Sequence, residues 1–240
     1  MLNLCKASLA SAWFYSRGRR GQYRKLAVKT AVTEQNALSS ESCHKLRKKL
    51  DDICDDHAHE RVWKDPHESD IRVIRFEQDI PELIPELDLP SKLAAIEGYT
   101  GRPARHWFLM GNRLNPKKGN LGSGGGLHRD SPFTHQIKFI WYLSRVTSQS
   151  GPFRYLPGSN GNLWRDRDKF PLGETRFPNL KSDELVEVLG GPGTLLACDT
   201  KCIHGGKPII EGTRYAITLY TFASAQSLGR SISGLGLTVK

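Results

Sequence analysis

The feature that most constrains the fold is a series of short apolar segments after Gly101, each separated from the next by glycine or proline. Segments of this length and composition indicate β-strands, and the glycines and prolines between them supply turns. No long helical pattern alternates with these segments, which disfavours a parallel α/β sheet. We therefore predict a jelly-roll core of two sheets, similar to cupins. Its strands are expected at 105–113, 126–129, 136–146, 153–156, 184–188, 194–198, 207–210 and 214–222.

The first part of the chain has a different pattern. Residues 1–65 are expected to be helical, because apolar residues recur there at helical spacing, as at Leu46, Leu50 and Ile53. A strand is expected at 71–76, and a short helix from Pro90 to Glu97. We therefore predict one mainly β domain with flanking helices, in which a helical region over 1–100 packs on a core over 101–240.

Composition limits the class of protein further. With 240 residues, 38% hydrophobic, the chain can form one domain with a complete core, and no apolar run approaches the roughly 18–20 residues needed to cross a bilayer. A secretory signal is not expected, because the basic cluster near the N-terminus follows the apolar stretch. The five cysteines are scattered, and although Cys198 and Cys202 loosely resemble a metal pair, reduced thiols and a cytoplasmic location are expected.

The net charge of +10 favours anionic partners, such as a phosphorylated or carboxylated small molecule, a lipid headgroup or nucleic acid. Much of the excess lies in residues 1–30, which contain no acidic residue. This segment is either a solvated basic helix or a contact with a membrane surface or another anionic surface. No helix-turn-helix, zinc finger or stacking pattern is found, so a specific nucleic-acid site is not expected.

A metal site is indicated by His128 and Asp130, which form a His-x-Asp unit. Residues two apart on an extended segment point to the same side, so both side chains can bind one cation. His204 follows the strand expected at 194–198, which would cross the jelly roll to the same end. Two histidines and one carboxylate leave three positions of an octahedron open, which is the facial triad of non-haem Fe(II) oxygenases. A bidentate 2-oxo acid and O2 would occupy the open positions.

Three residues are candidates for binding the 2-oxo acid. Arg214, ten residues after the last metal ligand, is placed to grip the distal carboxylate in a two-point fork. Asn112 is either a further polar contact to the oxo acid or an ordinary residue at a strand end. Lys138 interrupts an apolar run, so it either reaches an anionic co-substrate or substrate, or extends to solvent.

Two further residues are candidates for contacting the substrate. Arg129 points away from its two neighbours and either grips substrate at the rim or pairs with a surface acid. Gln136 is expected on the same face of its strand as the candidate lysine. Specificity is expected from the glycine-rich loop at 122–126, the segment at 165–179 and the N-terminal region.

The stretch from 105 to 223 resembles the phytanoyl-CoA dioxygenase family of Fe(II)- and 2-oxoglutarate-dependent oxygenases. Three blocks in the same order carry the resemblance: GLHRDS at 126–131, SGPFRYLPGS at 150–159, and GPGT at 191–194 before His204 and Arg214. The resemblance implies that His128, Asp130 and His204 bind iron and that Arg214 binds 2-oxoglutarate.

The chain departs from the family pattern at two positions, neither of which binds metal in the family. Asn160 stands where the family has histidine after Pro-Gly-Ser, and Arg129 stands where it often has glutamine. Because the acidic ligand is Asp130 and not glycine or alanine, the resemblance implies hydroxylation in preference to halogenation.

The leading hypothesis is a dioxygenase that uses Fe(II), 2-oxoglutarate and O2 to hydroxylate a small or medium-sized anionic metabolite of lipid, acyl or sugar type. Succinate and CO2 would be released. One alternative is a cupin-like metal-binding or sensing protein without turnover, and another is a different metal enzyme such as a zinc hydrolase. Arg214 favours the first hypothesis, because a barrel that only binds metal has no need for a buried cation at that position.

Overall fold

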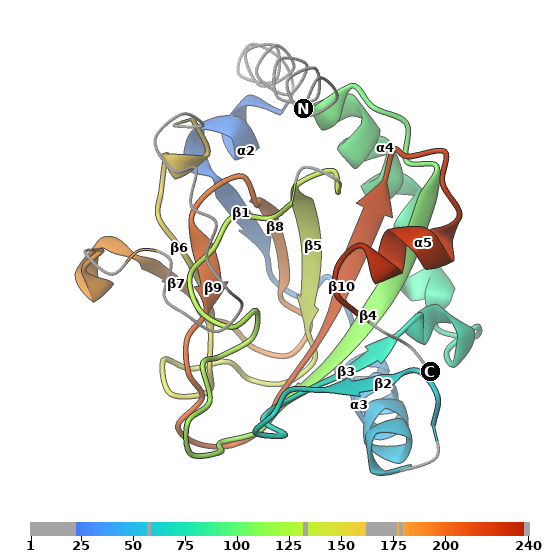
Figure 1. Cartoon of the computed structure of the whole chain (residues 1–240), viewed down its shortest axis with the longest axis vertical. Helices are drawn as coiled ribbons and strands as arrows, with labels where there is room; N and C mark the ends of the chain where they lie inside the picture. The colour runs from blue at the N-terminus through green and yellow to red at the C-terminus, as the bar shows by residue number, and fades with distance from the viewer. Residues whose placement is uncertain (1–22, 57–58, 132–133, 162–176, 178–179, 238–240) are drawn as a thin grey trace.

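Two antiparallel sheets form the core of the part described by the computed structural model, which comprises residues 23–56, 59–131, 134–161, 177 and 180–237. The larger sheet has the order β1-β8-β5-β10-β4-β3-β2 (Figure 1). Its strands are β1 (Ala31–Glu34), β2 (Val62–Lys64), β3 (Asp70–Ile74), β4 (His106–Leu114), β5 (Ile137–Tyr142), β8 (Leu195–Asp199) and β10 (Arg214–Phe222). The smaller sheet has the order β7 (Val186–Val188), β6 (Phe153–Tyr155) and β9 (His204–Gly206). The prediction of a mainly β core with flanking helices is confirmed.

Short helices connect and cover the sheets. The α-helices in the described residues are α2 (Arg24–Lys29), α3 (Ser40–Asp55), α4 (Leu89–Thr100) and α5 (Leu228–Ser233). Single 3-10 turns lie at η1 (Phe76–Gln78), η2 (Ile84–Leu87), η3 (Ser159–Gly161) and η4 (Ser182–Glu184). None of the helices in the described part of the chain is long and apolar enough to cross a membrane.

The outer face of the larger sheet is covered by α3 and α4. Leu46, Leu50 and Ile53 of α3 are buried, as their helical spacing predicted, and they belong to one apolar cluster with the outward residues of β3 and β10. The helix begins where the Ser39 side chain accepts a hydrogen bond from the backbone N–H of Ser42 at 3.0 Å, an ordinary N-cap. The inner face is therefore left for the functional groups.

The inner face of the larger sheet carries both apolar and charged residues. Because opposed residues of antiparallel strands share a face, Arg72, Asn112 and Ala216 lie in one row across β3, β4 and β10. The smaller sheet packs over one part of this face through Phe153 and Tyr155, while α5 lies over β4 and β10 (Figure 1). A space between the two sheets remains, and it contains the candidate site.

The prediction that residues 1–65 are helical is wrong at two places. β1 pairs with β8, and β2 pairs with β3, so both join the larger sheet. With four and three residues, these strands are too short to show a period of their own, and the partner of β1 is also distant in sequence. The N-terminal hundred residues thus contribute three strands, with β3 included, to the sheet that holds the site.

Other elements also differ from the prediction. Residues 207–210 form no strand, and 126–129 contribute one isolated bridge, between His128 and His204. The strand of the smaller sheet at that place is β9, which contains two glycines and was not predicted. Helix α4 continues through Gly98 to Thr100 and ends at Gly101, whose φ is +65°. A Cβ at Gly98 would collide with the ring of Tyr23, so this glycine serves packing and does not end the helix.

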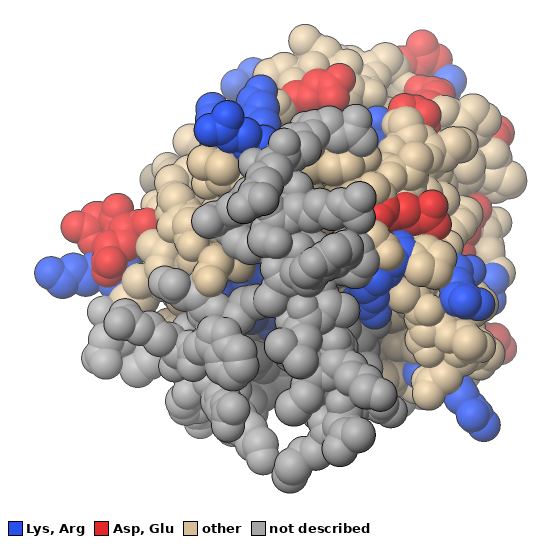
Figure 2. All heavy atoms as spheres, turned by 90° about the horizontal axis from the view of Figure 1, so that it is seen from above, with Lys and Arg blue, Asp and Glu red and all other residues tan. Residues whose placement is uncertain are grey.

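Residues 1–22, with most of the basic N-terminal cluster that was expected to favour anionic partners, lie outside the described residues. On the face shown in Figure 2, basic side chains of the described residues lie beside acidic ones. The proposed specificity segment at 165–179 also lies outside the described residues, apart from Phe177.

Candidate metal centre

The side chains of His128, Asp130 and His204 converge between the two sheets. Their ligand atoms all lie within 4.8 Å of one another. Both histidine Nε2 atoms are 3.7 Å from Asp130 Oδ1, which is too long for a hydrogen bond but leaves room for a cation between them. The backbones of the two histidines are joined by N–H···O bonds of 2.8 and 2.9 Å, so strand-like pairing holds the rings side by side.

The backbone fixes which nitrogen of each ring faces the centre. His128 Nδ1 lies 2.9 Å from the carbonyl oxygen of Gly126, and His204 Nδ1 lies 3.0 Å from that of Cys202. A carbonyl oxygen can only accept, so each Nδ1 carries the hydrogen and each Nε2 presents its lone pair to the centre. Burial, and then the charge of His128, lowers the pKa of His204 to about 4, which keeps this ring neutral at neutral pH.

Asp130 is compensated by a buried lysine. Its Oδ2 lies 3.3 Å from Nζ of Lys138, whose side chain is only 4% exposed and whose ammonium sits 3.9 Å from the ring centre of Tyr220. Burial opposes ionisation of Asp130, but Lys138 and then the two histidines hold the pKa of this carboxyl well below its usual range. Burial also lowers the pKa of Lys138, with Asp130 opposing that shift.

This donor set fits a divalent metal such as Fe(II). Two neutral imidazole nitrogens and one carboxylate oxygen are the ligands that such ions accept, and no thiol takes part. Oδ2 of Asp130 has the ion pair with Lys138 but no hydrogen-bond donor of good geometry among the described residues, and Oδ1 faces both histidine Nε2 atoms, where a cation would bind.

The glycine-rich loop at 122–126 lies against the centre. Gly124 has a φ of +89°, and a Cβ built on it would lie 2.6 Å from Cε1 of His128. Only glycine allows both the left-handed backbone and this close approach. The loop is therefore part of the wall around His128 and not a plain linker.

Arg214 forms the opposite part of the site. Its side chain is 4% exposed, and it donates to two neutral acceptors, the carbonyl of Gly151 and Oδ1 of Asn112, the latter at 3.1 Å. No carboxylate among the described residues forms an ion pair with Arg214, and its buried Nε has no acceptor there. Burial lowers the pKa of this guanidinium. A buried cation with only neutral partners is suited to receive an anion.

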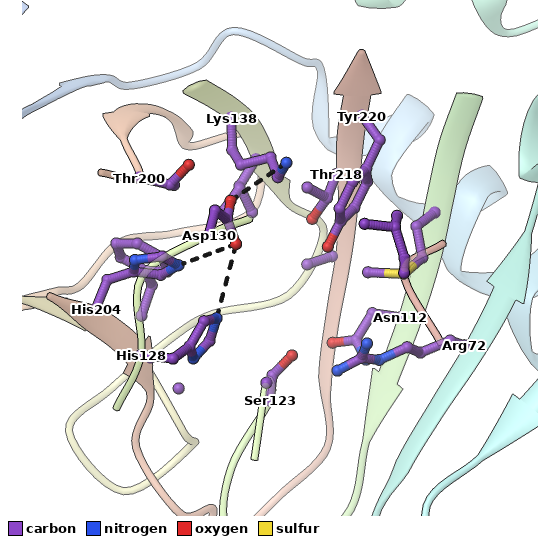
Figure 3. Close-up of a pocket in the computed structure, with 18 of the residues that line it drawn as sticks. Arg72, Asn112, Ser123, His128, Asp130, Lys138, Thr200, His204, Thr218 and Tyr220 are labelled. Carbon is purple, nitrogen blue, oxygen red and sulfur yellow. Dashed lines mark ion pairs between the residues drawn. The ribbon is translucent and has the colours of Figure 1, made fainter. Parts of the chain in front are cut away.

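A cavity of about 350 Å³ connects the two groups. Figure 3 shows Asp130 with both histidines and Lys138 on one side, and Asn112 with Arg72 on the other. The cavity is lined by these predicted residues: Asn112, His128, Arg129, Asp130, Lys138, His204 and Arg214. The structure thus brings together all predicted site residues except Gln136.

The two candidates for substrate contact have other partners. The amide of Gln136 donates to the backbone carbonyl of Asp130 at 2.8 Å and so holds the segment that carries the candidate metal ligands. Arg129 lines the cavity, but its Nη1 donates to the backbone carbonyls of Ser159, at 2.7 Å, and of Lys201. Arg129 therefore joins three segments around the site.

Asn160, the departure from the family pattern, is fully buried. It donates to Asp199 at 3.0 Å and accepts from Thr30 at 3.1 Å, and a third bond at 3.2 Å reaches the carbonyl of Ala27. The residue thus ties the turn after β6 to β8 and to the N-terminal segment, outside the cavity.

Several lining residues were not predicted from the sequence. Arg72 of β3, Tyr220 and Thr218 of β10, and Thr200 all face the cavity, and Leu235 and Leu237 cover it from the C-terminal segment. The signal for Arg72 was its place within a predicted strand, where a charged residue must face either solvent or a polar site.

Solved structures with the same fold are similar to this chain over most of its length. HygX from Streptomyces hygroscopicus, with nickel and 2-oxoglutarate bound, has a TM-score of 0.60 and 16% identity, over 86% of this chain and 87% of its own. EvdO2 from Micromonospora carbonacea var. aurantiaca, complexed with 2-oxoglutarate, has a TM-score of 0.59 and 15% identity, over 85% and 91%. The carbocyclase SnoK from nogalamycin biosynthesis has a TM-score of 0.60 and 17% identity, over 83% and 81%. The fold is therefore that of the cupin-like, 2-oxoglutarate-dependent non-haem iron oxygenases.

The sequence profile of phytanoyl-CoA dioxygenase (PhyH) matches residues 30–212, which is most of the chain. The protein therefore belongs to the phytanoyl-CoA dioxygenase family, and the predicted class of Fe(II)- and 2-oxoglutarate-dependent oxygenases is confirmed. No curated protein matches the chain. The match begins at β1, which agrees with the place of the N-terminal strands in the sheet, and it ends two residues before Arg214.

Proposed function

We propose that the protein is a dioxygenase that hydroxylates a small or medium-sized anionic metabolite, of lipid, acyl or sugar type. It consumes 2-oxoglutarate and O2 and releases succinate and CO2. The observation that supports this most directly is that the His128–Asp130–His204 cluster and the buried Arg214 face one cavity.

In this proposal, Nε2 of His128, Nε2 of His204 and Oδ1 of Asp130 hold the iron. When bound, the iron binds and activates the 2-oxo acid and O2. The carbonyls at the two Nδ1 atoms keep the imidazoles oriented and in the required tautomer. Lys138 holds Oδ2, which leaves Oδ1 directed toward the histidines.

Arg214 is proposed to bind the distal carboxylate of 2-oxoglutarate. Asn112 would orient this guanidinium through the bond to Nη2, and Lys138 is a second candidate for contacting the co-substrate. Because these groups are buried, a carboxylate bound there meets little competition from water. Arg129 is the candidate for substrate contact at the rim, and Gln136 is proposed to position the backbone of Asp130.

Hydroxylation is proposed because Asp130 supplies a carboxylate to the metal and leaves no ligand position for a halide. Two similar structures are named as a carbocyclase and an epimerase, so the same fold also supports reactions other than hydroxylation. The reaction type is tested by mass spectrometry of the product formed under ¹⁸O2, in which hydroxylation adds one labelled oxygen atom.

A cytoplasmic location is proposed from the cysteines. All four in the described residues, Cys43, Cys54, Cys198 and Cys202, are free and buried. Contact of the basic N-terminus with an anionic surface stays a prediction, since that segment is outside the described residues.

The function is tested by anaerobic titration of the purified apoprotein with Fe(II) and then 2-oxoglutarate. We expect the weak visible absorption of the iron–oxo acid chelate in the wild-type protein and in Arg145→Met, which removes an exposed cation away from the site. The absorption should be lost in His204→Ala. Iron binding without this absorption in a folded wild-type protein would instead support the alternative of a metal-binding or sensing protein without turnover.

A further inference from the structure

We propose that Arg72 binds an oxyanion of the primary substrate, a carboxylate or a phosphate, separately from the 2-oxoglutarate held by Arg214. This inference rests on the proposed function and adds to it the residue and the chemical group that select the substrate.

Arg72 is held rigidly with part of its guanidinium free. Its Nε and Nη2 donate to the same oxygen of Asp70, at 3.1 and 2.6 Å, and the guanidinium carbon lies 4.8 Å from the ring centre of Trp63. Within the described part of the chain, Nη1 has no hydrogen-bond acceptor. Figure 3 shows the guanidinium reaching from β3 to Asn112 at the cavity wall. A fixed donor with an unused N–H group costs little entropy to engage.

Asn112 separates the two guanidinium groups. Its Oδ1 accepts from Arg214, while its Nδ2 donates to Asp70, which holds Arg72. One arginine therefore comes from β10 and the other from β3, on opposite sides of one amide. This arrangement gives two anion sites with different surroundings.

The surroundings of Arg72 suit a substrate with an apolar part. Met110, Tyr220, Leu235 and Leu237 line the same cavity, and Met110 and Leu237 belong to one apolar cluster under α5. An acyl chain or ring could contact these side chains while its anionic group reaches Nη1.

The charge of the cavity also calls for an anion besides 2-oxoglutarate. Asp130 is the one carboxylate among the described lining residues, whereas Arg72, Lys138 and Arg214 are cationic. The two charges of Fe(II) and the two of 2-oxoglutarate cancel. The cavity therefore stays positive after the co-substrate has bound, even with Asp70 counted beside Arg72, and this favours an anionic substrate.

The inference is tested on the anaerobic Fe(II)·2-oxoglutarate complex with three probes of equal chain length: hexanoate, hexyl phosphate and neutral hexanamide. Dissociation constants are measured by calorimetry for the wild type, Arg72→Met, Arg72→Lys and the surface control Arg145→Met. We expect at least one charged probe to bind roughly tenfold or more tightly than the amide in the wild type and in Arg145→Met. Comparing the two charged probes distinguishes a carboxylate from a phosphate. The preference should vanish in Arg72→Met and be partly kept in Arg72→Lys.

Removing Arg72 alone leaves Asp70 without its cation, so the double variant Asp70→Asn/Arg72→Met is included to preserve folding. Equal binding of charged and neutral probes to the wild type, or no binding of any, would overturn the inference. The inference would also be overturned if Arg72→Met and Asp70→Asn/Arg72→Met still bound a charged probe more tightly than the amide. If Arg72→Met weakened 2-oxoglutarate itself about tenfold, Arg72 would be a co-substrate ligand and the inference would be wrong, with the proposed function intact. Absence of the chelate absorption in the wild type, seen before any probe is added, marks failure of the proposed function itself.

Discussion

Replacing Lys138 by methionine should lower the unfolding free energy of the apoprotein and raise its affinity for the metal. Its ammonium lies 3.3 Å from Asp130 and is buried. At an effective dielectric of about 20, this pair contributes about 5 kcal/mol of Coulomb energy before desolvation. Breaking a buried pair by removing one partner costs about 3–5 kcal/mol, because the other charge stays buried without compensation.

A bound divalent cation would supply the compensation that Lys138→Met removes. The metal-loaded variant should therefore lose much less stability than the apo variant. By linkage, the difference is gained in metal affinity, and 3 kcal/mol corresponds to about a hundredfold.

The assay is urea denaturation of the wild type, Lys138→Met and Arg145→Met, each with and without Co(II). We expect a loss of unfolding free energy of about 3 kcal/mol or more for apo Lys138→Met, with a larger gain on adding Co(II) than in the wild type. Arg145→Met should behave as the wild type in both states. An apo variant as stable as the wild type, or one that Co(II) stabilises less, would refute this account of the Lys138–Asp130 pair.

Three further predictions concern other parts of the molecule. Arg214→Met should weaken 2-oxoglutarate binding by at least about 30-fold in anaerobic calorimetry while leaving Fe(II) affinity unchanged, because a buried cation partner is lost; unchanged co-substrate affinity would exclude the role given to Arg214. Gly193→Ala should lower the free energy of unfolding, measured by urea denaturation, by about 2 kcal/mol or more, because φ is +85° and a Cβ would collide with the carbonyl of Leu38. Gly191→Ala is the near-neutral control, because a Cβ there would have nothing within 4 Å. The pKa of His204 falls from 6.5 to about 4 on folding, so between these values the folded apoprotein binds fewer protons than the unfolded chain. Its unfolding free energy should therefore drop by roughly 3 kcal/mol as the pH falls from 7 to 4. A smaller drop is expected in His204→Gln, and equal drops in both proteins would contradict this assignment.

The candidate metal and co-substrate residues could be predicted because they follow local rules. His128 and Asp130 are two apart on an extended segment, His204 comes shortly after the strand expected at 194–198, and Arg214 begins the strand expected at 214–222. Their convergence needed only the fold class.

The residues that were missed depend on long-range register. Arg72 lies in a segment that was expected to be a strand, but its position in the cavity follows from the pairing of β3 with β4, opposite Asn112. The short strands β1 and β2 form only because β8 and β3 offer partners, and β9 forms because it pairs with β6. The pairings of β1 with β8 and of β9 with β6 join segments far apart in the sequence, and β2 is too short to be recognised beside its neighbour β3.

Which of the two substrate-contact candidates, Arg129 or Gln136, reaches the cavity also depends on tertiary structure. Both side chains satisfy backbone carbonyls of neighbouring segments, and only Arg129 reaches the cavity. Sequence identifies such residues as polar groups in an apolar setting but does not indicate which acceptor they meet.

The most direct test of the central claim is a crystal structure of the anaerobic Fe(II)·2-oxoglutarate complex, with anomalous data collected at the iron edge. The account predicts one iron peak bounded by His128 Nε2, His204 Nε2 and Asp130 Oδ1, with the distal carboxylate of 2-oxoglutarate on Arg214. An iron peak away from these three atoms, or a co-substrate that leaves Arg214 without a carboxylate, would contradict it.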